Sequence, residues 1–229
     1  MQRRDFIAAA AAAGFAGRVR AATPATILVV GDSLSAEYGL RKGTGWVPLL
    51  ERKLRDEKVD ARVINASISG DTTSGGRSRL PTLLQQHQPT HVILELGGND
   101  ALRGLPLAMT QDNLAQMTQA AQQAGARVLL LGMQMPPNYG ADYSAKFSAM
   151  YEDVARRDKA ALVPFFLRGV ADVPDAEKLF QRDRIHPTEQ AQAQLLANVW
   201  PELRRLLADP VAGGKPAAAK VRATGSARP

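Results

Sequence analysis

The sequence predicts a three-layer α/β/α fold, in which a five-stranded parallel sheet lies between two layers of helices. Five short apolar runs alternate with longer amphipathic segments between residues 25 and 208. Such repeated strand–helix units are typical of a parallel sheet covered on both faces. The 229 residues, 45% of them hydrophobic, are enough for one sizeable core. We therefore expect a single folded domain of the α/β class.

The elements follow from local patterns. Strands are predicted at the apolar runs 26–30, 61–65, 91–96, 127–131 and 160–164. Helices are predicted where apolar residues recur at three- and four-residue spacing, first at Trp46, Leu49, Leu50 and Leu54 and later at Leu114, Met117 and Ala121. A last helix is predicted to begin at Pro187, because proline favours the first helical turn. Its apolar face is formed by Leu195, Leu196, Val199, Trp200 and Leu203.

The two ends of the chain differ from the folded part in composition. Residues 1–21 begin with paired arginines and continue into an alanine-rich apolar run, which indicates an export signal peptide of the twin-arginine type. Residues 210–229 are rich in Ala, Gly, Pro and Lys, and we expect a disordered basic tail. These two segments account for the whole net charge of +7, so residues 22–209 offer no net positive charge to a nucleic acid.

Other features narrow the class of protein. The sequence has no cysteine, which excludes disulfides, thiolate metal sites and a cysteine-linked lipid anchor. No stretch is long and apolar enough to span a membrane once the signal is removed. With the predicted export signal, these features indicate a periplasmic or secreted protein, and the residues described next indicate that its substrate is a small molecule.

Polar and glycine-rich segments directly follow several predicted strands. Ser33 follows the first strand, Gly70 lies in the loop after the second, and Asn99 follows the third. Asp183 and His186 come after the fifth strand, before the last helix. Because the carboxyl ends of parallel strands meet at one edge of the sheet, these residues are expected to form one site.

These residues supply what acyl transfer requires. A serine hydroxyl needs a base to accept its proton, and His186 is the candidate base for Ser33. Asp183 is placed to accept a hydrogen bond from the other imidazole nitrogen and so fix the tautomer. The backbone N–H groups of Ser33 and Gly70 and the side-chain amide of Asn99 are candidate donors to the oxyanion of the tetrahedral intermediate.

Four sequence blocks in this order resemble the SGNH (GDSL-type) hydrolase superfamily: Gly-Asp-Ser-Leu-Ser at 31–35, the segment 65–72 around Gly70, Gly-Gly-Asn-Asp at 97–100, and Asp-x-x-His-Pro at 183–187. The chain is most similar to its bacterial periplasmic thioesterase I, lysophospholipase and arylesterase group. The resemblance covers residues 26–205 and implies a flavodoxin-like sheet within a hydrolase domain at 22–209. It also implies Ser33 as nucleophile, Asp183 and His186 as acid and base, and Gly70 and Asn99 as oxyanion donors.

The leading hypothesis is a serine hydrolase of acyl esters and thioesters, including aryl esters, acyl-CoA and lysophospholipids, that needs no cofactor and no metal. Asp71 and Asp100 are expected to support loops, and His87 and His91 to be structural. Five residues are candidates for an acyl-binding groove, namely Leu102, Leu105, Met133, Met135 and Tyr139. Two alternatives stay open: a carbohydrate O-acetylesterase, against which the apolar groove residues argue, and a non-catalytic periplasmic binding protein.

Overall fold

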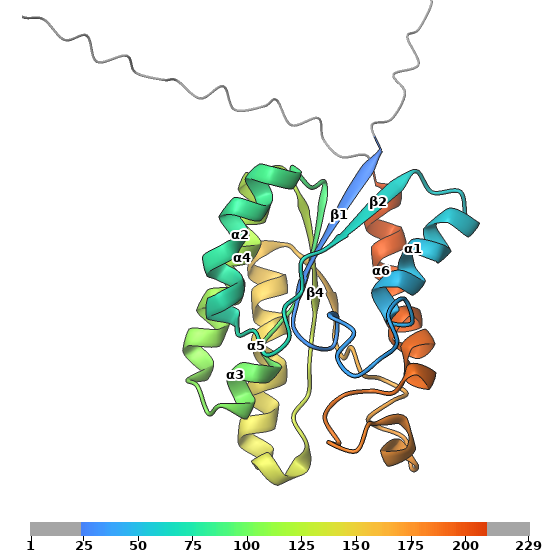
Figure 1. Ribbon diagram of the computed structural model, residues 1–229. Helices are drawn as coiled ribbons and strands as arrows, with labels where there is room; N and C mark the ends of the chain where they lie inside the picture. The colour runs from blue at the N-terminus through green and yellow to red at the C-terminus, as the bar shows by residue number, and fades with distance from the viewer. Residues whose placement is uncertain (1–23, 210–229) are drawn as a thin grey trace, which may run out of the picture.

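A computed structural model describes residues 24–209. It contains one five-stranded parallel sheet with strand order β2-β1-β3-β4-β5, flanked by helices on both faces (Figure 1). This confirms the predicted three-layer fold, and the strand order is the flavodoxin-like one. The predicted signal peptide at 1–21 and the predicted tail at 210–229 lie outside the described residues.

All five predicted strands are present. They are β1 (Ala25–Gly31), β2 (Ala61–Asn65), β3 (His91–Glu95), β4 (Arg127–Leu131) and β5 (Ala161–Val163). The central strands are buried because helices cover both faces, so their sequences are almost continuously apolar instead of alternating. The edge strand β2 is only partly buried.

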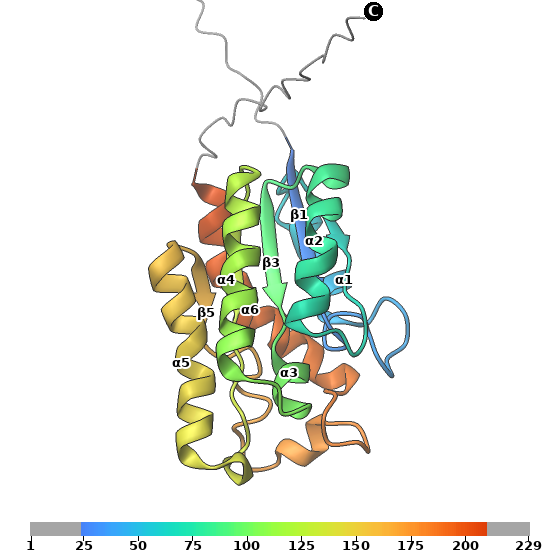
Figure 2. The same cartoon turned by 90° about the vertical axis from the view of Figure 1, so that its left-hand side faces the viewer.

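The helices form two layers. On one face α1 (Trp46–Asp56) packs against α6 (Gln192–Ala208). On the other face α4 (Leu107–Gln123) lies between α2 (Thr73–His87) and α5 (Ala141–Asp158), as Figure 2 shows, with the short α3 (Gly98–Leu102) beside the amino end of α4. Within residues 24–209 no helix combines the length and the apolar character needed to cross a membrane.

The start of the last helix differs from the prediction. Pro187 does not begin a helix but forms an antiparallel bridge with Phe180, and the N–H of Thr188 donates to the carbonyl of Leu179 at 2.7 Å. A 3₁₀ turn, η3 (Glu189–Ala191), follows before α6 begins at Gln192. The φ angle that proline fixes is compatible with both the first turn of a helix and an extended bridge, so the presence of proline alone does not predict which of the two forms. His186 is therefore not the N-cap of a helix.

The strand order places the topological switch point between β1 and β3. The chain leaves β1 toward β2 on one side, whereas β3 leads to β4 and β5 on the other. In open α/β sheets the crevice at the carboxyl ends of such strands is the usual ligand site. Ser33 follows β1 and Asn99 follows β3, so both lie at this point.

Candidate active site

A chain of hydrogen bonds joins three of the predicted residues. Nε2 of His186 lies 2.8 Å from Oγ of Ser33, and Nδ1 of the same ring lies 2.8 Å from Oδ2 of Asp183. The two contacts use opposite sides of the imidazole, so the hydroxyl, the ring and the carboxylate are in the order that proton transfer from serine requires. The structure thus brings together residues that are far apart in the sequence.

The loop that presents Asp183 and His186 is closed at its base. The N–H of Gln181 donates to the carbonyl of His186 at 2.8 Å, and the N–H of Arg184 donates back to Gln181 at 2.9 Å. Arg184 has a left-handed backbone conformation, with φ of 59°. This turn reverses the chain between Asp183 and His186, so the carboxylate folds back onto the imidazole.

The electrostatics of Asp183 favour its charged form. Burial alone would raise the pKa of this carboxyl group, but hydrogen bonds from the N–H groups of His186 and Ile185 and from the imidazole outweigh it. The two backbone donors lie 3.0 and 2.9 Å from Oδ1. Together they lower the pKa of Asp183 to about 2. Asp183 is therefore a carboxylate at any pH at which an esterase is assayed.

The three candidate oxyanion donors come from three segments, each of which follows a different strand. Gly70 has a left-handed φ of 79°, and its carbonyl accepts a hydrogen bond of 2.7 Å from Nη2 of Arg103, at the end of α3. The side-chain amide of Asn99 donates to Oδ2 of Asp32 at 3.0 Å, next to Ser33, which leaves its second N–H for another acceptor. Among the described residues, the backbone N–H groups of Ser33 and Gly70 donate no hydrogen bond.

Asp71 and Asp100 hold loops, as expected. The buried Asp100 accepts hydrogen bonds from the N–H of Thr73 at 2.9 Å and from its hydroxyl group, so it binds the first turn of α2. Asp71 forms an ion pair of 2.8 Å with Arg79. His91 is buried, its Nε2 lies 3.3 Å from the carbonyl oxygen of Leu206, and burial lowers the pKa of its ring.

The candidate acyl-groove residues differ in exposure. Leu102 is 48% exposed, and Leu105, Met135 and Tyr139 are half-buried. Met133 is only 8% exposed and belongs to the hydrophobic core, so little of its side chain is open to a substrate. The reason is that hydrogen bonds of Gly132 to Val163 and Phe166 continue the sheet pairing beyond the end of β4.

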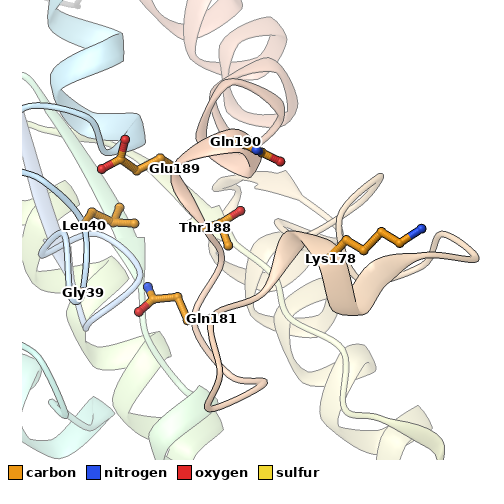
Figure 3. A pocket seen from close by; sticks show the side chains of 7 residues that line it. All are labelled: Gly39, Leu40, Lys178, Gln181, Thr188, Glu189 and Gln190. Carbon is orange, nitrogen blue, oxygen red and sulfur yellow. The ribbon is translucent and has the colours of Figure 1, made fainter.

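A cavity of about 400 Å³ adjoins the loop of the candidate triad (Figure 3). It lies between the turn after β1 and the two segments that flank the loop 182–187, and Gln181 and Thr188 come from those segments. Its lining includes none of Ser33, Asp183 or His186 and none of the five candidate groove residues. The predicted apolar groove is therefore not this cavity.

Three contacts at the site were not expected from the sequence. The ring of Tyr38 packs against His186, Arg103 binds the carbonyl of Gly70, and Glu95 lies buried beside Asp32. Only Glu95 has a sequence signal that could have revealed it, namely a charged residue that ends an otherwise apolar strand. Within residues 24–209 no group of three or more His, Asp and Glu side chains is arranged to hold a metal.

The comparisons with known proteins agree with this geometry. The model of the GDSL-like lipase/acylhydrolase family matches residues 29–194. The chain is 56% identical to esterase TesA of Pseudomonas aeruginosa over 182 residues, which is 80% of this chain and 89% of that protein. It is 44% identical to the Escherichia coli K12 thioesterase 1/protease 1/lysophospholipase L1 over 173 residues, 76% of this chain and 80% of that protein.

A solved structure extends the similarity to the fold. The crystal structure of TesA matches with a TM-score of 0.76 at 56% identity, and the match covers 79% of this chain and 99% of that chain. The matched family model spans the blocks that contain Ser33, Gly70, Asn99, Asp183 and His186. The chain belongs to the GDSL-like lipase/acylhydrolase family.

Proposed function

We propose that this hydrolase cleaves acyl esters and thioesters through an acyl-enzyme formed on Ser33, with His186 as the base and Asp183 as the group that orients it. The observation that supports the proposal most strongly is the unbroken hydrogen-bonded chain from Ser33 Oγ through the imidazole to Asp183. A lone serine hydroxyl is a weak nucleophile, and this contact gives its proton a destination.

In the first half of the reaction, Oγ of Ser33 attacks the carbonyl carbon of the substrate while its proton passes to Nε2 of His186. The carbonyl oxygen becomes an oxyanion, to which the N–H groups of Ser33 and Gly70 and the amide of Asn99 donate. The tetrahedral intermediate then collapses, and the bond to the leaving oxygen or sulfur breaks. His186 returns the proton to that atom, so an alcohol or thiol departs and the acyl group stays on Ser33.

In the second half, water replaces the leaving group. His186 takes a proton from the water as its oxygen attacks the acyl-serine carbonyl, and the same donors hold the second oxyanion. Collapse releases the carboxylic acid, and the proton on His186 returns to Ser33 Oγ. Asp183 stays a carboxylate throughout, because it stabilises the imidazolium in each half without taking its proton.

The substrate class rests on the relatives and on the surroundings of the site. One relative is named an esterase, and the other a thioesterase and lysophospholipase. Exposed Leu102 and half-buried Met135 are the candidates to contact an acyl chain. Carbohydrate O-acetyl groups are not favoured by these names, and a binding protein without catalysis has no use for the complete triad.

Labelling with a fluorophosphonate probe tests the nucleophile directly. The wild-type enzyme is expected to take up the probe on the peptide that contains Ser33, and Ser33→Ala to take up none and to lose hydrolysis of p-nitrophenyl butyrate by at least about 10⁴-fold. Ser78→Ala, an exposed change on α2, is the matched control and keeps both properties. Wild-type turnover in folded Ser33→Ala, or labelling of a different serine, would overturn the assignment.

We further propose that residues 1–21 direct export, on the basis of the paired arginines and the alanine-rich run that follows them. Fractionation of bacteria that express the full chain is expected to recover the shortened enzyme outside the cytoplasm. Replacing Arg3 and Arg4 by lysine distinguishes the routes: the enzyme accumulates in the cytoplasm if the twin-arginine route is used. Export of the doubly substituted chain at the normal level would show the general route instead.

A further inference from the structure

A second carboxyl group lies buried beneath the nucleophile turn, where the reaction has no direct use for it. Glu95 ends β3 and is 1% exposed, and its partner in the sheet register is Gly31, at the end of β1. A Cβ atom on Gly31 would come within 2.8 Å of Oε2 of Glu95. It would also come within 2.8 Å of Oγ and 2.9 Å of Cβ of Ser35, so the side chains of Glu95 and Ser35 together leave room only for a glycine before Asp32.

The Glu95 carboxyl group binds both sides of the turn that presents Ser33. Its Oε2 accepts hydrogen bonds from the N–H of Asp32 at 3.3 Å and from Oγ of Ser35 at 2.8 Å. The indole Nε1 of Trp46 donates to the same serine hydroxyl at 3.2 Å, which leaves the Ser35 proton directed to Glu95. Ser33 therefore lies between two residues that Glu95 holds.

Asp32 connects Glu95 to a candidate oxyanion donor. The two carboxyl groups are neighbours in the interior: both residues are buried, and the N–H of Asp32 donates to Oε2 of Glu95. Asp32 also accepts hydrogen bonds from the N–H of Leu34 at 3.0 Å and from the amide of Asn99 at 3.0 Å. These donors favour the charged form of Asp32, and a second charge on the buried neighbouring carboxyl group is unfavourable, so a proton is expected to stay on Glu95.

The surroundings keep that proton on Glu95. Burial, together with the neighbouring Asp32, raises the pKa of Glu95 well above its usual value, and burial raises the pKa of Asp32 to about 6. Within residues 24–209 no Lys or Arg forms an ion pair with either carboxyl group. Two other titratable groups interact electrostatically with the pair, Tyr151 on α5 and His186 in the triad loop. Arg79 on α2 donates to the carbonyl of Gly31 but forms its ion pair with Asp71.

We propose that Glu95 is a positioning residue that acts as a neutral acid beside the Asp32 carboxylate and thereby fixes the Ser33 turn relative to the amide of Asn99. Ser33 follows β1 and Asn99 lies in α3 after β3, and this buried pair links the two segments. The catalytic part of this inference rests on the proposed role of Ser33, whereas the protonation of Glu95 does not.

The comparison of two substitutions tests the role. Glu95→Gln keeps the shape, offers an N–H to Asp32 and retains a carbonyl oxygen for the Asp32 N–H, whereas Glu95→Ala removes all of these contacts. We expect Glu95→Ala to lower kcat by about 10²-fold with a smaller effect on KM, because a small displacement of a reacting group is costly. Glu95→Gln is expected to restore most of that loss. A glutamine variant as impaired as the alanine variant would overturn the proposal.

The pH dependence of stability separates a neutral acid from a carboxylate. Because its folded pKa is raised, Glu95 binds a proton more tightly in the folded protein, so wild-type stability falls as pH rises above the unfolded value of 4.5. Glutamine does not ionise, so Glu95→Gln does not lose stability in this way. Its melting temperature is therefore expected to fall less than that of wild type between acid and alkaline pH. Glu152→Gln, on the exposed side of α5, is the matched control and follows wild type.

A measurement on the unaltered enzyme covers the case in which the variants do not fold. With ¹³C-labelled glutamate side chains, NMR at neutral pH is expected to show one carboxyl signal in the protonated range. Ionisation of every glutamate under these conditions would overturn the inference, whatever the activity of Ser33→Ala shows about the nucleophile. A protonated signal in an enzyme whose Ser33→Ala variant is fully active would instead overturn only the catalytic assignment.

Discussion

The phenol ring of Tyr38 lies against the imidazole of His186, with their centroids 4.3 Å apart and their planes inclined by 37°. The Tyr38 carbonyl accepts a hydrogen bond of 2.9 Å from Nε2 of Gln181, at the base of the triad loop. The same residue also follows the nucleophile turn, since its N–H donates to the carbonyl of Ser33 at 3.3 Å. Tyr38 thus connects the loop of the base to the loop of the nucleophile.

Removing this ring is expected to slow the reaction without abolishing it. Aromatic contacts of this kind contribute about 0.5–1.5 kcal/mol, so Tyr38→Ala should lower kcat by up to about tenfold. Tyr38→Phe retains the ring and should keep nearly wild-type kcat. Steady-state kinetics on p-nitrophenyl butyrate makes the comparison, and equal losses in the two variants would show that the hydroxyl group, not the ring, matters.

Asp183→Asn should leave the triad loop in place but supply a hydrogen-bond donor where the imidazole needs an acceptor. We expect kcat to fall by up to about 10⁴-fold, the scale known for this change in serine proteases, because the histidine adopts the wrong tautomer. A crystal structure or a melting curve of the variant serves as the control for folding. Nearly normal turnover in a folded variant would contradict the orienting role.

The same residue predicts a pH effect on stability. Its folded pKa of about 2 lies below the usual value of 3.8 for an aspartate, so the stability that its hydrogen bonds give is present above pH 3.8 and is lost as pH falls toward 2. The difference in melting temperature between wild type and Asp183→Asn should therefore shrink on acidification. A constant difference from neutral to acid pH would show that the carboxylate contributes no charge-dependent stability.

The strands and the triad could be predicted because each rests on a local signal. Strands buried on both faces are continuous apolar runs, as in Ile27–Val30, and the residues that follow them meet at one edge. The contact of Tyr38 with His186 depends on the path of two loops, and no spacing in the sequence records it. Met133 is buried because Gly132 still pairs with the neighbouring segment after the end of β4. The sequence Gly-Met-Gln-Met-Pro-Pro gives no sign of that extra pairing.

Asn99 and Asp100 are neighbours in the sequence with different expected roles. Asn99→Ala should lower kcat by about 10²–10³-fold, because it removes a donor to the oxyanion. Asp100→Ala should mainly destabilise the fold, by about 2–3 kcal/mol, since it leaves the buried hydroxyl of Thr73 without its acceptor. Kinetics and denaturation of both variants test this contrast. If Asn99→Ala lost as much stability as Asp100→Ala, the two residues would not differ in role as proposed.

The last prediction concerns the length of the acyl chain. Met135 lies in the loop after β4, is half-buried and packs against the core, so part of its side chain is available to a substrate. If it lines the acyl groove, each CH₂ of substrate that it helps to bury adds up to about 0.8 kcal/mol to binding. Met135→Ala should then weaken kcat/KM for long acyl esters more than for acetate.

The measurement is kcat/KM for p-nitrophenyl esters of increasing chain length, with wild type and Met135→Ala assayed side by side. Leu207→Ala is the matched control, because Leu207 is also a half-buried apolar residue. It lies in the last turn of α6, next to Leu206, whose carbonyl contacts His91 at the amino end of β3, away from the site. Leu207→Ala should change kcat/KM by the same factor for every ester. The same uniform shift in Met135→Ala would show that this methionine only packs against the core, and that the acyl chain is bound by other residues, with exposed Leu102 as the next to substitute.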